Sequence, residues 1–212
     1  VTVLVSLWIS KVLSTRGKKI NAFAKAVFYL PSVTNQVALV IVWNFLFSPA
    51  FGLVASIFRI LKLDPISWFD SPVTAIPLLA LLICTYGLGQ PVILYTAAIN
   101  GIPDCYFEAA RIDGATENQI FFSITLRLLH GTTTYILITS TIGMLQIFAV
   151  PYLMTNGGPS FRTSTLLMLV YTSAFQNGSF GYASAIGVVL FFITAAIAFI
   201  QFRMMRQDAI EY

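Results

Sequence analysis

Charged residues are rare in this chain, and an unusual concentration of them lies in residues 102–129. Only 9% of all residues are charged, yet this stretch contains four of the eight acidic ones. Its charged and small side chains stand together in one short run: Glu108, Ala109, Ala110, Arg111, Asp113 and Gly114. Charges fix the register of a bound partner, and small side chains permit its close approach. The run therefore has the chemistry of a docking surface.

A second set of candidate residues is uncharged and lies inside long apolar runs: Tyr86, Gln90, Ser140, Gly143, Met144 and Ile147. Amides, hydroxyls and an aromatic ring suit an uncharged, polyhydroxylated solute better than an ion. Tyr86 and Gln90 stand beside glycines and a proline that weaken a helix, and this position favours a solute path. Ser140 and Gly143 are equally consistent with close helix packing, so both interpretations stay open for them.

Helical spacing groups these polar residues into two faces. Ser140, Met144 and Ile147 are separated by four and three residues, so we expect them to share one helix face. Tyr86 and Gln90 are one turn apart, and we expect them to share a face of another helix. If the two faces meet at similar depth, they line one path.

Local signals predict that residues 102–129 fold as a helix, a tight turn and a second helix. Pro103 suits the first position of a helix, and Gly114 suits the left-handed residue that ends one, so we expect the first helix at 104–113. Thr116 with Gln119 three residues later is typical of a capping box. Apolar residues then recur at helical spacing: Ile120, Phe121, Ile124 and Leu128.

The composition of the whole chain indicates an all-α membrane protein. With 58% hydrophobic residues and a mean hydropathy of +0.84, a water-soluble globule would be short of polar surface. The net charge of +4 does not indicate nucleic-acid binding, because the cations gather at the ends of apolar runs. The two cysteines, Cys84 and Cys105, lie in different kinds of segment, so we expect neither a disulfide nor a metal site.

Apolar runs predict five membrane crossings, since roughly 20 residues span a bilayer. They are 1–13, 27–47, 73–99, 132–154 and 182–202. The first is too short for a full span, and the sequence opens in apolar residues without an initiator Met. We therefore expect that a sixth crossing precedes it. All crossings belong to one transmembrane domain, 1–212, within which 102–129 is a polar hairpin.

The distribution of Lys and Arg orients these crossings, because cations in short loops stay on the cytoplasmic side. Nine fall on one side: Lys11, Arg16, Lys18, Lys19, Lys25, Arg111, Arg127, Arg203 and Arg206. Three fall on the other: Arg59, Lys62 and Arg162. The hairpin is therefore predicted to be cytoplasmic, and the stretches 48–72 and 156–181 are predicted to lie at the outer interface.

Several kinds of membrane protein are disfavoured by what the sequence lacks. The four longer crossings contain no Asp, Glu, Lys or Arg, whereas ion-driven carriers commonly place such a residue at membrane depth. No phosphate-binding loop of the usual pattern is present, so ATP binding is expected in a separate protein. A channel or an intramembrane enzyme would need a filter repeat, a catalytic dyad or metal ligands, and we predict no catalytic and no metal-binding residues.

The hairpin resembles a known family. Its pattern E-A-A, three residues, G, nine residues and I-x-L, from Glu108 to Leu126, is similar to the cytoplasmic EAA loop in permease subunits of bacterial ATP-binding-cassette importers. The runs YFEAARIDGA, TNGGP and FGYASAIGVVLF resemble its maltose-type sugar branch. Arg127 stands where that family usually has proline, so the second hairpin helix is expected to run on from Glu117 into the next crossing.

The resemblance implies a fold, a function and partners. The fold would be the type I importer permease, an all-α transmembrane bundle in the bacterial cytoplasmic membrane. The function would be sugar import by alternating access; import of glycerol phosphate or a polyol is the alternative. The partners would be a second permease subunit, a cytoplasmic ATPase dimer that binds ATP and Mg, and an extracytoplasmic solute-binding protein. In that family the helix 104–113 docks in a cleft of the ATPase.

Overall fold

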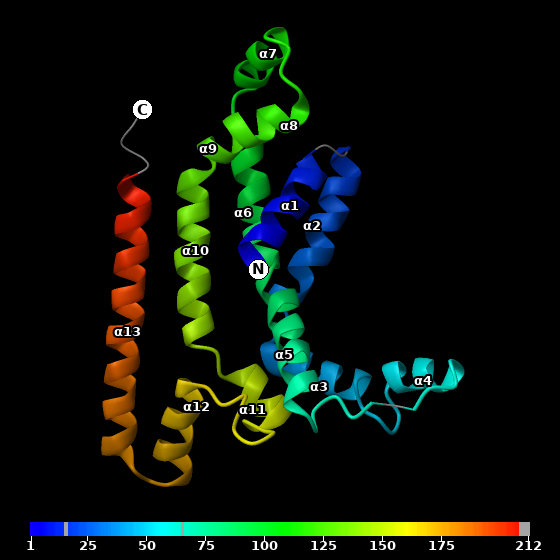
Figure 1. Cartoon of the computed structure of the whole chain (residues 1–212), viewed down its shortest axis with the longest axis vertical. Helices are drawn as coiled ribbons and strands as arrows, with labels where there is room; N and C mark the ends of the chain where they lie inside the picture. Colours follow the sequence, from blue (N-terminus) through cyan, green and yellow to red (C-terminus); the bar gives the residue numbers. More distant parts are fainter. Residues whose placement is uncertain (15–16, 65, 208–212) are drawn as a thin grey trace. The chain divides into compact units, whose positions relative to one another are not determined.

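The computed structural model describes residues 1–14, 17–64 and 66–207, and every regular element among them is a helix (Figure 1). The chain divides into two compact units. Unit 1 consists of Val1–Ser32, Gly87–Ile142 and Ile197–Tyr212, and unit 2 of Val33–Tyr86 and Gly143–Ala196. Two long helices, α10 (His130–Leu145) and α13 (Phe180–Gln207), contribute to both units.

The described helices include two that are long and apolar enough to cross a membrane: α13, and α10 together with α11 (Ala149–Thr155). Two helix pairs raise the number to four if each pair is one span. These pairs are α2 (Lys18–Val33) with α3 (Gln36–Leu46), and α5 (Pro72–Gly87) with α6 (Gly89–Asn100). The predicted crossings 132–154 and 182–202 coincide with the two long candidates, whereas 27–47 and 73–99 coincide with bent helix pairs that are crossings only if each pair is one span. Helix α1 (Thr2–Ser14) is as short as the sequence indicated.

Helix α1 packs along α6 in unit 1 through small side chains. Ser6 and Ser10 of α1 are fully buried, as are Val92 and Thr96 of α6. The Ser10 hydroxyl donates to the Val92 carbonyl at 3.1 Å, and the Thr96 hydroxyl lies 3.4 Å from the Ser10 hydroxyl. Ser6 and Ser10 lie one turn apart on α1, and such small residues let two backbones approach closely, as in helix association in membranes.

The start of α6 also approaches α2 closely, at Gly89. A Cβ atom at this position would lie 2.7 Å from the carbonyl oxygen of Phe28 and 2.6 Å from the Ser32 hydroxyl. The sequence suggested that Gly89 weakens the third crossing. The structure gives it a second role, because only a residue without a side chain fits against the backbone of α2.

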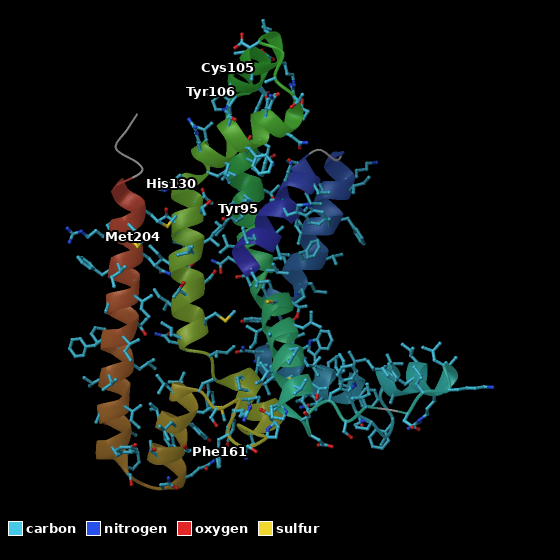
Figure 2. All side chains as sticks on the ribbon, in the orientation of Figure 1. Tyr95, Cys105, Tyr106, His130, Phe161 and Met204 are labelled. Carbon is cyan, nitrogen blue, oxygen red and sulfur yellow. The ribbon has the colours of Figure 1, made fainter. Side chains whose placement is uncertain are left out.

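The remaining packing in unit 1 joins α6, α10 and the end of α13. Tyr95 of α6 is fully buried, and its hydroxyl donates to Thr133 of α10 at 3.2 Å (Figure 2). The Gln201 amide of α13 donates to the Thr141 hydroxyl of α10 at 2.9 Å. These contacts fix the two helices that enter and leave the hairpin.

Unit 2 has its own apolar core, built from α3, α5 and α11. Its buried residues are Val40, Leu78, Leu79, Leu82, Val150 and Met154. Trp68 packs against this core with its ring edge-on to Phe47 at 5.6 Å, and it also contacts Phe58 of α4 (Leu53–Ile60). The unit is completed by α12 (Leu166–Tyr171) and the π-helix η2 (Thr172–Gln176).

Two of the predicted crossings are interrupted at positions where a continuous helix was expected. The run 27–47 breaks before α3, whose N-cap residue Asn35 accepts a hydrogen bond from the Val37 amide at 2.8 Å. The run 132–154 breaks after Leu145, where the Ile147 carbonyl accepts a hydrogen bond from Thr165 at 2.9 Å. In both places a side chain satisfies backbone groups that an unbroken helix would have paired internally.

The predicted orientation fits this division of the chain. All nine cations assigned to the cytoplasmic side fall in segments of unit 1, and the other three fall in segments of unit 2. Lys11 contacts Asn118 of the hairpin at 3.0 Å, which agrees with the prediction that both lie on the cytoplasmic side. Arg16 and the side chains of Lys18 and Arg206 lie outside the described residues.

We expect thiol labelling in intact cells to report this orientation. A cysteine introduced at Gln119 should be protected from a membrane-impermeant reagent, whereas one introduced at Asp64 should react, because both positions are exposed. The exposed native Cys105 should behave like position 119 and react only after the cells are permeabilised. Labelling of position 119 from outside the cell would reverse the predicted topology.

Candidate functional site

The hairpin begins with α7 (Asp104–Ile112), close to the predicted 104–113. Pro103 precedes the helix as its N-cap, with φ −59° and ψ 136°, so it stands one position earlier than predicted. Gly114 has φ +81°, as the sequence indicated. Its N–H donates to the Arg111 carbonyl at 3.1 Å, and the Ala115 N–H donates to the Ala110 carbonyl at 2.9 Å. This pair of bonds is the Schellman arrangement, which requires a left-handed residue.

The exposed face of α7 contains only one of the two predicted alanines. Ala109 is exposed, whereas Ala110 is buried, because neighbours in a helix point about 100° apart. Tyr106 and Ile112 add large exposed side chains, with 51% and 86% of their surface accessible. Cys105 and Tyr106 are seen on α7 in Figure 2. The flat surface that we expected from both alanines is therefore formed by Ala109 alone.

The charges of the hairpin are divided between internal and outward roles. Arg111 Nε donates to Glu117 Oε1 at 2.9 Å, which joins the two helices across the turn and raises the pKa of the Arg111 guanidinium. Both side chains are exposed, so the pair is screened by solvent. Glu108 and Asp113 are exposed and form no hydrogen bond or ion pair that the described residues show. Arg111 thus has a partner within the hairpin, while the two carboxylates remain open.

The second hairpin helix starts as predicted but continues differently. The Thr116 N–H donates to Gln119 Oε1 at 2.8 Å, and the Gln119 N–H donates to the Thr116 hydroxyl at 3.4 Å. This capping box opens α8 (Glu117–Ile120), which passes into a π-helix, η1 (Phe121–Thr125), and then α9 (Leu126–Leu128).

A continuous helix from Glu117 into the next crossing was expected because Arg127 replaces proline. The structure instead turns at Leu129, which has φ −81° and ψ 1°, before α10 begins. Leu129 is almost fully buried and packs with Tyr95, Ile99 and Ile136. Burial of this side chain therefore bends the chain without a proline.

The hairpin is also held from the side by α1, which the sequence did not predict. The Lys11 ammonium donates to the Asn118 side chain at 3.0 Å and lies 4.3 Å from the centre of the Phe121 ring. Residues 11 and 118 are 107 positions apart, so no local signal could have paired them.

The six predicted path residues belong to both units. Gln90 and Ser140 lie in unit 1, whereas Tyr86, Gly143, Met144 and Ile147 lie in unit 2. Gln90, Gly143 and Met144 are exposed, and the other three are half-buried. Among the described residues, the side chains of Tyr86, Gln90 and Ser140 have no hydrogen-bond partner. The hydroxyls of Thr139 and Thr141, in contrast, donate to carbonyls of the preceding helical turn.

The two predicted faces both need correction. The chain breaks at Leu88, so Tyr86 belongs to α5 and Gln90 to α6 rather than to one continuous helix. Helix α10 ends at Leu145, so Ile147 does not continue the face of Ser140 and Met144. The role of all six residues in a solute path stays a prediction.

Comparison with known proteins identifies the family. The family profile described as binding-protein-dependent transport system inner membrane component matches residues 3–207. The chain belongs to this family. Its members are transport permease components, so membership agrees with the all-α membrane fold and with the EAA pattern of the hairpin.

Two relatives with named substrates are similar over most of the chain. The sulfoquinovosyl glycerol transport system permease protein SmoG of Agrobacterium fabrum is 34% identical over 79% of this chain and 54% of its own length. The lactose transport system permease protein LacF of Rhizobium radiobacter is 30% identical over 98% of this chain and 71% of its own length. For several relatives, the chain spans only 54–65% of their length.

A chain of a solved transporter structure has the same fold. A chain in the crystal structure of a bacterial alginate ABC transporter, in complex with an alginate pentasaccharide-bound periplasmic protein, superposes with a TM-score of 0.86. It is 22% identical, and the match covers 97% of this chain and 71% of that chain. The fold predicted from the sequence, that of an ABC importer permease, is confirmed.

Proposed function

We propose that this permease component is one transmembrane subunit of an ATP-driven importer that moves a sugar or oligosaccharide across the bacterial cytoplasmic membrane. The observation that carries the proposal is α7, an exposed, capped helix between α6 and α10 in a chain of this family. A charged hairpin of defined shape at the end of two apolar helices is suited to receive force from a cytoplasmic protein. This chain itself is proposed to catalyse no reaction.

The proposed energy source is a separate ATPase dimer, which would bind ATP and Mg. Its cleft would receive the exposed face of α7, where Ala109 permits close approach and the open carboxylates of Glu108 and Asp113 set the register. Arg111 would preserve the shape of the hairpin through Glu117. Closure of the ATPase on ATP would then move α6 and α10 together and switch the permease between inward-facing and outward-facing states.

Two further partners follow from the same proposal. A second permease subunit would complete the path, which is consistent with the exposure of Gln90, Gly143 and Met144. An extracytoplasmic solute-binding protein would deliver the solute, as the periplasmic protein named in the alginate transporter structure suggests.

A sugar is the favoured solute because the predicted path residues offer neutral hydrogen-bonding groups. The names of LacF and of the alginate transporter support a carbohydrate. The name of SmoG, a sulfoquinovosyl glycerol permease, keeps a glycerol derivative or a polyol as the second candidate.

Variants of the path residues should separate solute binding from ATP hydrolysis. We expect Gln90→Ala and Tyr86→Ala to lower solute uptake several-fold, because one lost hydrogen bond costs about 1 kcal/mol. Basal ATPase activity should stay near normal. Thr194→Ala is the control, since the Thr194 hydroxyl only bonds to the Leu190 carbonyl of its own helix at 2.8 Å. Impaired uptake by the control with normal uptake by both path variants would place the path elsewhere.

Reconstitution tests the proposed function as a whole. The chain would be purified with its second permease, ATPase and binding protein, placed in liposomes, and supplied in turn with labelled disaccharides, oligosaccharides, polyols and glycerol phosphate. We expect one carbohydrate to accumulate only with ATP and to stimulate ATP hydrolysis several-fold. Uptake driven by an ion gradient without ATP would overturn the proposal.

A further inference from the structure

Lys11 lies in the last turn of α1 and reaches the second half of the hairpin. Its ammonium donates to Asn118 Oδ1 at 3.0 Å. The same group lies 4.3 Å from the centre of the Phe121 ring and 5.1 Å from that of Phe122. A cation over an aromatic ring is attracted by the partial negative charge on the ring face. One ammonium therefore contacts three side chains of the hairpin.

The π-helix η1 explains how two neighbouring rings reach the same ammonium. Phe121 and Phe122 begin this helix, and their rings meet edge to face with centres 5.3 Å apart. A π turn contains more residues than an α turn, so consecutive side chains diverge less. Such turns are frequent at functional sites. The local widening therefore forms a small cation-binding surface that α1 occupies with Lys11.

Helix α1 is also bound, by independent contacts, to α6, the helix that leads into the hairpin. Ser10 bonds to the Val92 carbonyl of α6, and Ser6 and Thr96 are fully buried between the two helices. Because α6 leads into the hairpin and α8 with η1 form its second half, α1 contacts both segments. A displacement of the hairpin is thus transmitted to α1 from two directions.

We infer that Lys11 is a positioning residue that fastens the second half of the hairpin to α1, so that α1 and the hairpin move as one body when the transporter changes state. This inference rests on the proposed function of the hairpin. It adds α1, which would otherwise be a passive neighbour of α6, to the elements that convert ATP hydrolysis into movement of the path.

Removal of the ammonium should loosen coupling without preventing assembly. Lys11→Met keeps most of the aliphatic stem and loses all three contacts of the charge. The hairpin could then move without α1. Uptake per ATP hydrolysed should fall about threefold to tenfold, while solute-independent ATP hydrolysis rises. Lys11→Arg retains a donor and a cation for the rings, so it should restore most of the coupling.

The contact itself is tested first, by a measurement that does not depend on transport. A photoreactive benzoylphenylalanine at position 11, in the complete complex in native membranes, should form intramolecular cross-links that mass spectrometry maps to residues 118–122. Cross-links only to other segments would overturn the inference.

The functional test compares uptake and ATP hydrolysis in the reconstituted complex. Lys19→Met is the matched control, because Lys19 is an exposed lysine of α2 on the same predicted side. The double variant Lys11→Met/Asn118→Leu should be no worse than the more affected single variant, since both remove one shared contact. If the wild-type complex couples ATP to sugar uptake and Lys11→Met does so equally well, the inference fails while the proposed function stands. If the wild-type complex shows no ATP-driven uptake, the proposed function fails, whatever the cross-links show.

Discussion

Replacing Gly114 with proline is expected to reduce ATP-dependent uptake at least tenfold while the chain still inserts and assembles. Gly114 has φ +81°, and proline is fixed near −65°, so the turn between the hairpin helices cannot form. Proline also lacks the N–H that donates to the Arg111 carbonyl. Uptake and solute-stimulated ATP hydrolysis in reconstituted liposomes would measure the loss.

Gly114→Ala provides a graded control for the same turn. No neighbouring atom lies within 4 Å of a Cβ at this position, so alanine would cause no clash. Its only cost would be the left-handed backbone conformation, which lowers stability by about 1–2 kcal/mol. We expect a partial defect for alanine, a smaller one for asparagine and a nearly complete one for proline. Normal uptake by a well-expressed Gly114→Pro variant would show that this turn does not transmit force.

Adding a methyl group at Gly89 should destabilise the protein, although the same change in a helix is usually favourable. The new Cβ would lie 2.7 Å from the Phe28 carbonyl oxygen, and the backbone of α2 would have to move. Overpacking of this kind costs about 1–3 kcal/mol. Because Gln90 follows directly, uptake should fall together with stability.

Gly87→Ala is the matched control two residues earlier. Its Cβ would meet only the Thr2 methyl carbon at 3.8 Å, an ordinary contact. Alanine favours helix over glycine by up to about 1 kcal/mol, so this variant should be neutral or slightly more stable. Thermal melting of the solubilised complex would compare the two variants. Equal melting temperatures for Gly87→Ala and Gly89→Ala would contradict the close packing of α6 against α2.

The hairpin could be predicted from the sequence in detail because its signals are local. Gly114 at the turn and the Thr116–Gln119 capping box each satisfy backbone groups within a few residues. Asn35 was an equally local signal for the break before α3, since it is a favoured N-cap residue.

Other features depend on distant contacts that composition and spacing do not reveal. The bend at Leu129 follows from burial against α6, and the end of α10 follows from Thr165, eighteen residues beyond Ile147. In the sequence, Lys11 counts only as one of the cations that orient the crossings, yet in the structure it contacts the hairpin directly. Such pairings are decided by the tertiary fold, so the two predicted faces of the path are wrong, whereas the turn at Gly114 and the capping box of the hairpin are confirmed.

Cross-linking of the exposed face of α7 to the ATPase tests the central claim most directly. In a Cys105→Ser background, Ala109→Cys would be treated with a reagent that joins a cysteine to nearby lysines, in the assembled complex. The account predicts a product between this chain and the ATPase from position 109, and none from Phe161→Cys, an exposed position in unit 2. Absence of an ATPase product from position 109, or an equal product from position 161, would contradict the docking of the hairpin on the ATPase.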